Sequence, residues 1–214
     1  MRSLGATLID PIQPPDTKSI NDDELTVLFS EFKVDIEGYL AGLRATSLRT
    51  LGDLIAFNDE HCTDELRHFG QELFHVADAT TGLDDPAYRE ARARCLAATR
   101  TNGIDRILAA DRLDAIVGPA YGDSSAPAVA GYPAISVPTG TTDDGRPGGV
   151  WLSAGFLGEP ALLGFAFDLE SELDGRPRPT FAGTLPDLPP DAGICAIPVA
   201  DRVRTRRGDL PADV

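Results

Sequence analysis

The chain has few cysteines, few basic residues and no long apolar run. Its 214 residues include three cysteines, and 19 lysine and arginine residues stand against 34 acidic ones. Because Cys62, Cys95 and Cys195 are widely spaced and odd in number, they make neither a metal motif nor a disulfide framework. The sequence therefore predicts reduced thiols and a cytoplasmic protein. No apolar run approaches the roughly 20 residues of a membrane span, so we expect no membrane association.

The charge balance limits the class of partner. The formal net charge is −15, and the pI is about 4.4. Nucleic acid and anionic membrane surfaces would be repelled by such a chain, so neither is an expected partner. Hydrophobic residues make up 42% of the chain, which is enough for a core, and 25% of the residues are charged. These values suit a globular protein with an acidic, solubilising surface.

Candidate chemical motifs are scarce. His61, His68 and His75 recur every seven residues, about 10.5 Å apart along a helix, which is too far for two imidazoles to share one metal ion. A Ser-His-Asp triad can be spelled from the composition, but no G-x-S-x-G elbow supports it. The glycine-rich run Gly145–Gly149 opens a strand and not a helix, so it predicts a hairpin turn. The sequence therefore predicts no metal site.

Apolar periodicity predicts helices in the first half of the chain, and short apolar runs bounded by Gly and Pro predict strands. Helices are expected near residues 21–43, 51–57, 65–79, 85–98, 103–113 and 160–170. Strands are expected at residues 6–9, 114–118, 134–137 and 149–155. Helices followed by strands that alternate with a helix indicate an α/β protein, with a mixed sheet flanked by helices.

One stretch, Ala126–Pro138, organises the second half of the chain. Gly131 is expected to end its small-residue segment, and Pro133 favours extended geometry after it. The short strand that follows Pro133 is expected to end at Pro138, which has no N–H to donate to a strand ladder. The run AGYPAISVPTG, the glycine-rich turn and apolar strand after it, and the helix that contains ALLGFAFDLE resemble, in this order, the C-terminal region of the amidase-signature family. The segments LIAFN, FGQELF and TGLDDPAYREA are similar to the same family.

This resemblance implies the C-terminal part of the amidase-signature fold, with the N-terminal catalytic half missing. In that family a nucleophilic serine, a relay serine and a neutral lysine hydrolyse carboxylic amides without metal or organic cofactor. Both serines lie in a Gly/Ser-rich stretch that has no counterpart here. The two lysines of the chain, Lys18 and Lys33, do not follow an apolar strand as the family's lysine does, and for Lys33 an ion pair or a solvated side chain is expected. No catalytic residue is therefore assigned.

The segment around the Ser-Ser pair is the expected substrate contact. By resemblance, Tyr121, Asp123, Ser124 and Ser125 belong to a segment that borders the substrate pocket and is not the nucleophile. The alternative is an ordinary surface loop.

Residues 1–181 are expected to form the amidase-like domain, and residues 182–214 a Pro- and Arg-containing tail that is loosely ordered. Three hypotheses follow. The chain is a truncated amidase that is inactive alone, or one half of a two-chain amidase, or a non-catalytic binding or scaffold protein that reuses the fold. The expected partners are a complementary N-terminal amidase chain or a second copy, and a small amide only after complementation.

Overall fold

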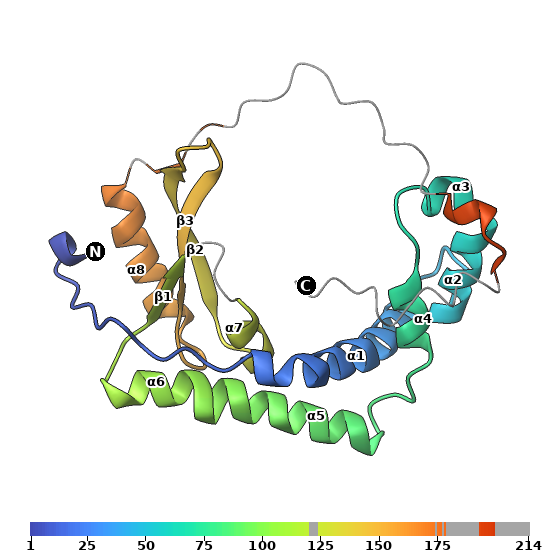
Figure 1. The fold of residues 1–214 in the computed structure, drawn as a ribbon, viewed down its shortest axis with the longest axis horizontal. Helices are drawn as coiled ribbons and strands as arrows, with labels where there is room; N and C mark the ends of the chain where they lie inside the picture. The colour runs from blue at the N-terminus through green and yellow to red at the C-terminus, as the bar shows by residue number, and fades with distance from the viewer. Residues whose placement is uncertain (120–123, 174, 177, 179–192, 200–214) are drawn as a thin grey trace. The chain divides into compact units, whose positions relative to one another are not determined.

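The computed structural model describes residues 1–119, 124–173, 175–176, 178 and 193–199. Figure 1 shows these residues as a ribbon, and they divide into two compact units. Unit 1 comprises Met1–Glu24 and the described part of Glu90–Phe181. Unit 2 comprises Leu25–Arg89 and the described part of Ala182–Val214. Within the described residues, no helix is both long enough and apolar enough to pass through a bilayer.

Unit 1 is built on a sheet of three described strands, β1 (Ile116–Pro119), β2 (Ala134–Thr141) and β3 (Pro147–Ser153). The strand order is β1-β3-β2, and both pairings are antiparallel. The turn between β2 and β3 is the one that the glycine-rich run predicts. All three strands lie at positions where the sequence predicts strands, and helices flank the sheet as expected (Figure 1).

Alternation along the strands gives each face of the sheet its own core. On one face, Leu152 of β3 and Val137 of β2 pack against α8 (Glu159–Glu172). On the other face, Ile116 of β1 and Trp151 of β3 meet the helices around Ile107. These helices are the π-helix η3 (Ala97–Ile104), α6 (Asp105–Ala110) and α7 (Ser125–Ala130).

Two glycines of unit 1 occupy positions that disfavour a larger residue, Gly118 through lack of space and Gly131 through its backbone conformation. Gly118 of β1 lies against the indole of Trp151, and a Cβ there would come within 2.4 Å of the indole Nε1. Gly131 follows α7 with φ of 64° and ψ of 36°, the left-handed conformation that ends many helices. The break that the sequence predicts at Gly131 is therefore observed, but the small-residue segment before it is a helix.

The beginning of the chain contains one wrong prediction. Arg2–Leu4 is a short 3₁₀ helix, η1, and it ends at Gly5. The strand predicted at residues 6–9 is not formed. A strand exists only when a neighbour completes its hydrogen-bond ladder, and among the described residues no strand pairs with this segment. A second 3₁₀ turn, η2 (Lys18–Ile20), leads into α1 (Asn21–Gly42).

Unit 2 is helical in its described part. It contains α1 from Leu25 onward, α2 (Leu51–Glu60), α3 (Cys62–Glu65), α4 (Glu72–Asp78) and the start of α5 (Pro86–Leu96). Its core joins Leu51 and Ile55 of α2, Ala77 of α4, and apolar side chains of α1 that include Phe32. The helix predicted at residues 65–79 is interrupted between α3 and α4, where Gly70, a poor helix former, lies.

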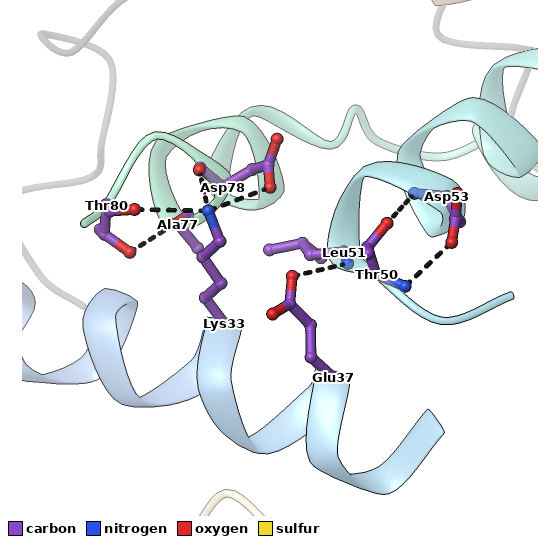
Figure 2. Close-up of polar contacts among 8 residues, drawn as sticks. All are labelled: Lys33, Glu37, Thr50, Leu51, Asp53, Ala77, Asp78 and Thr80. Carbon is purple, nitrogen blue, oxygen red and sulfur yellow. Dashed lines mark hydrogen bonds and ion pairs between the residues drawn. The ribbon is translucent and has the colours of Figure 1, made fainter. Parts of the chain in front are cut away.

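Polar contacts fix the beginning of α2, which packs beside α1 in unit 2. Figure 2 shows the capping box of α2, in which the Thr50 hydroxyl accepts a hydrogen bond from the Asp53 N–H at 3.0 Å. The Asp53 carboxylate accepts in return from the Thr50 N–H at 2.9 Å. Glu37 of α1 accepts from the Leu51 N–H at 3.4 Å, which satisfies another unpaired donor at the start of α2.

The cysteine prediction is wrong for two of the three residues. Cys62 of α3 and Cys195 of the short 3₁₀ helix η4 (Ile194–Ala196) form a disulfide across 133 positions of sequence. Cys95 is a free thiol, buried at 2% exposure. Disulfides persist mainly in oxidising compartments, so the argument from reduced thiols to a cytoplasmic location no longer holds.

The boundary expected after residue 181 stays a prediction, because only residues 193–199 of the expected tail are described.

We expect the oxidised protein to yield a linked peptide pair containing Cys62 and Cys195 when it is alkylated and digested without reductant. Only Cys95 should be alkylated, and only after unfolding, because its thiol is buried. Replacing both Cys62 and Cys195 with Ser should lower the free energy of unfolding by about 2–4 kcal/mol, measured by denaturant titration without reductant. Alkylation of all three cysteines in the unreduced chain would contradict the pairing.

Candidate functional site

The Ser-Ser pair lies at the beginning of α7. Ser124 is the residue before the helix and is exposed, and Ser125 is its first residue and is half-buried. Tyr121 and Asp123, the other two predicted substrate contacts, lie outside the described residues. The structure therefore places two of the four predicted residues, side by side at one helix end.

Ser125 meets a carboxylate from a distant part of the sequence. Its hydroxyl lies 3.1 Å from Oε1 and 3.0 Å from Oε2 of Glu24, in the first turn of α1. Both residues belong to unit 1, although 101 positions separate them. Glu24 is one of three acidic residues in the first turn of α1, and no sequence signal pairs it with Ser125. Glu24 is thus a site residue that the sequence analysis missed.

An ion pair next to Glu24 holds the start of α1. Arg94 of α5 donates from Nε to Asp23 Oδ2 at 2.7 Å and from Nη2 to Oδ1 at 2.6 Å, a two-pronged contact that fixes direction as well as distance. The hydrogen bonds from Arg94 lower the pKa of the Asp23 carboxyl. Burial, and then the charges of Asp23 and Glu24, raise the pKa of the Cys95 thiol. That thiol stays protonated near neutral pH and is a poor nucleophile.

A second cluster fixes the segment that follows α7. Arg100 donates from Nε to the Ala130 carbonyl at 2.7 Å, and its guanidinium lies 5.4 Å from the centre of the Tyr132 ring. The Tyr132 hydroxyl donates to Asp105 Oδ1 at 2.9 Å. Burial raises the pKa of the Tyr132 hydroxyl, and the hydrogen bond to Asp105 adds to the rise. Both ends of α7 are therefore attached to other elements of unit 1.

The described contacts of Ser125 do not include an activating base. A carboxylate is a weak base for a hydroxyl, and nucleophilic serines are activated by histidine, lysine or an amine. Lys18, the lysine that belongs to the same unit as Ser125, is exposed. Within the described residues, Ser125 and Glu24 can bind a polar group but form no nucleophile–base pair.

Lys33 of unit 2 has a structural role in the contacts that Figure 2 shows. Its Nζ donates to the Asp78 carbonyl at 2.5 Å and to the Thr80 carbonyl at 3.3 Å, and it lies 3.5 Å from Asp78 Oδ1. These contacts join α1 to the end of α4. Of the two expectations for Lys33, an ion pair or a solvated side chain, the structure shows the ion pair, with Asp78 as its partner, and backbone carbonyls also hold the ammonium group.

The histidines do not converge on a shared centre. His61 Nδ1 lies 2.9 Å from the Phe57 carbonyl, and the two rings stack with centres 4.1 Å apart. His75 Nε2 is buried and has no hydrogen-bond partner among the described residues. Among the residues that the structure describes, no group of three or more His, Cys, Asp or Glu side chains could hold a metal ion. The absence of a metal cofactor stays a prediction.

We expect a strong chelator to leave the thermal unfolding midpoint unchanged, and added zinc not to raise it. A metal that binds only the folded state would stabilise it by about 2.7 kcal/mol at a hundredfold excess over its dissociation constant. Thermal unfolding with chelator, with zinc and with neither checks this. A midpoint that rises with zinc and falls with chelator would contradict our interpretation of the histidines.

We expect the Asp23–Arg94 pair to make stability depend on pH in the acid range. The pKa of Asp23 is lowered in the folded state, so its stabilisation is complete above the unfolded pKa of about 3.9. It is lost as pH falls through the folded pKa. Arg94→Gln should therefore reduce the free energy of unfolding at pH 6, and the difference from the native chain should shrink as the pH falls below the unfolded pKa of about 3.9. Replacing the exposed Arg44 with Gln is the control, and an equal loss in both variants would contradict this assignment.

Known proteins resemble this chain in both sequence and fold. A probable amidase of Arabidopsis thaliana is 32% identical over 186 residues, which are 85% of this chain and 36% of that protein. A putative amidase of Schizosaccharomyces pombe is 26% identical over 182 residues, which are 76% of this chain and 31% of that protein. No model of a known protein family matches the chain.

The structural comparison agrees. The native peptide amidase of Stenotrophomonas maltophilia superimposes with a TM-score of 0.75 and 40% sequence identity, over 80% of this chain and 37% of that one. The chain thus spans about a third of the length of the relatives it matches. Sequence and fold together show that the chain is a homologue of part of an amidase.

Proposed function

We propose that the chain contributes one part of an amidase, and that it hydrolyses amides only when the remaining part of the enzyme is supplied. The observation that carries this proposal is that the match includes most of this chain but only a minor part of the peptide amidase. The match to the peptide amidase takes in 80% of this chain but 37% of that one. Most of an amidase's length therefore has no counterpart here, and by family resemblance the Ser-Ser-Lys residues belong to that remainder.

The contacts of the described residues support the same proposal. Ser125 has a carboxylate neighbour, which can orient a hydroxyl but is too weak to activate it. Lys33 is engaged by Asp78 and by backbone carbonyls. The role that fits Ser124 and Ser125 is contact with the substrate, together with Tyr121 and Asp123.

Peptide amides are the substrate class that we propose, because the solved relative is named a peptide amidase. The reaction adds water across the C–N bond of the amide, so that a carboxylic acid forms and ammonia or an amine leaves. The chain's own contribution is to present the beginning of α7 to the substrate. In the completed enzyme, the groups that attack the carbonyl and carry its proton come from the other part.

We expect the purified chain alone to hydrolyse neither peptide amides nor simple aryl and aliphatic amides, assayed by ammonia release at high protein concentration. Co-expression with the part of the Stenotrophomonas maltophilia peptide amidase that this chain does not match should give turnover. In that complex, Ser125→Ala should raise KM more than it lowers kcat, because the residue contacts substrate and does not react.

Two results would contradict this proposal. Turnover by the chain alone that disappears in Ser124→Ala or Ser125→Ala would show that the pair contains the nucleophile. A stable complex with no turnover towards any amide would instead favour the non-catalytic binding protein.

A further inference from the structure

The Cys62–Cys195 disulfide fastens a very short element to unit 2. Its second cysteine lies in η4, a three-residue turn beside α3, drawn in red in Figure 1. The hydrogen bond from the Ile197 N–H to the Ile194 carbonyl, at 3.0 Å, lies within this turn and its flank. Ile194 Cδ1 also lies 3.7 Å from the point that a Cβ on Gly70 would occupy. No residue of η4 is buried, so the turn packs on unit 2 with little of its own surface.

The core of unit 2 does not include the disulfide. Leu51 and Ile55 of α2, Ala77 of α4 and apolar side chains of α1 form this core. Neither cysteine of the bond belongs to that cluster of described side chains. Opening the bond therefore removes no side chain from the core, and α1, α2 and α4 keep their packing when the two sulfurs part.

The α3 side of the bond has anchors of its own. Leu66, the residue after α3, is 3% exposed, and its N–H donates to the Cys62 carbonyl at 2.9 Å. Gln71 donates from Nε2 to the Ile55 carbonyl at 3.1 Å and accepts at Oε1 from Asn58 Nδ2 at 3.0 Å, so it is tied to α2 at two points. These contacts hold the segment between α2 and α4 whether or not the disulfide is closed.

The two cysteines differ in exposure, which decides where a reductant attacks. Cys62 is buried, whereas Cys195 is half-buried. A thiolate that attacks Cys195 Sγ forms a mixed disulfide and expels the Cys62 thiolate, which takes up a proton. A second thiolate then attacks the mixed disulfide and releases Cys195 in the same way. Two thiols of the reductant become one disulfide, and the chain gains two electrons and two protons.

We propose that the Cys62–Cys195 bond is a redox-sensitive latch. When the bond is closed it holds η4 against α3, and when a thiol reduces it η4 leaves unit 2 while the helices keep their packing. η4 is the side that moves, because α3 stays anchored through Leu66 and Gln71, whereas η4 contributes no buried residue. The conformational entropy of the freed turn favours its release once the bond is open.

The test compares the oxidised full chain with the same chain treated with dithiothreitol, a neutral dithiol. After reduction, we expect the amides of residues 194–197 to exchange hydrogen at least about tenfold faster, by mass spectrometry of peptides. The amides of α2 and of Leu66 should keep their protection. When the reduced, folded chain is alkylated, Cys195 should react at least about tenfold faster than Cys62, because the Cys62 thiol stays buried.

Two variants make the comparison specific. Cys195→Ser removes the bond without a reductant, so it should exchange as the reduced chain does and should not respond to dithiothreitol. Cys95→Ala removes the buried free thiol and keeps the bond, so it should respond as the native chain does. Thermal unfolding checks that each variant is folded. If a variant is not folded, the native chain with and without dithiothreitol decides the matter.

The outcomes are separate from those of the proposed function, because no readout involves amide hydrolysis. Faster exchange confined to η4, together with fast alkylation of Cys195, supports the latch. Equal exchange of η4 in the oxidised and reduced chains overturns it, since other contacts would then hold the turn. Loss of protection in α2 and α4 along with η4 overturns it too, because the bond would then support the whole of unit 2. So does a bond that dithiothreitol reduces only in denaturant.

Discussion

The antiparallel pairing of β3 with both β1 and β2 is the constraint on which unit 1 depends. Because successive side chains of a strand point to opposite faces, Trp151 and Leu152 enter different cores. A shift of β3 by one residue would exchange them, and would also move the indole off Gly118, the residue that leaves room for it. The register of one seven-residue strand therefore decides where α8 packs and where α7 begins.

The packing of α7 against this sheet positions the candidate site, because Ser124 and Ser125 lie at the beginning of α7. The helix lies in the core that Ile116 and Trp151 share, and Arg100 holds its carboxyl end through the Ala130 carbonyl. Its first residue, Ser125, faces Glu24, whose neighbour Asp23 is held by Arg94. The serine hydroxyl is thus held by a carboxylate of α1, and Arg94 of α5 holds the residue next to that carboxylate. Such an arrangement suits recognition of a polar group at a fixed place, and Glu24, the described neighbour of the Ser125 hydroxyl, is a weak base.

Local pattern predicted most elements but few of the contacts between them. The periodicity of α1 and Pro133 before β2 are local signals, and both elements begin where expected. The expected end of the strand at Pro138 is wrong, because β2 continues through Pro138 to Thr141 in its pairing with β3. The strand at residues 6–9 failed because strand-forming residues need a partner, which the described sheet does not offer. α7 was missed because a run of small residues has no apolar period to mark it as a helix.

The site and the disulfide were beyond prediction for one shared reason. Glu24 and Ser125 are 101 positions apart, and each is ordinary in its own local sequence. The Cys62–Cys195 bond spans 133 positions, and three cysteines carry no information about which two are bonded. Resemblance to a family supplied the Ser-Ser segment, but neither resemblance nor periodicity names the residue that faces it.

The disulfide gives the chain a covalent topology with a practical consequence. Cys62 and Cys195 close a ring that contains the whole sequence between them, including residues 90–181, which belong to unit 1 although both cysteines belong to unit 2. A protease that cuts once anywhere inside this ring leaves two pieces that are still joined by sulfur. Such a nicked molecule keeps its mass, apart from one added water, until a thiol reagent opens the ring.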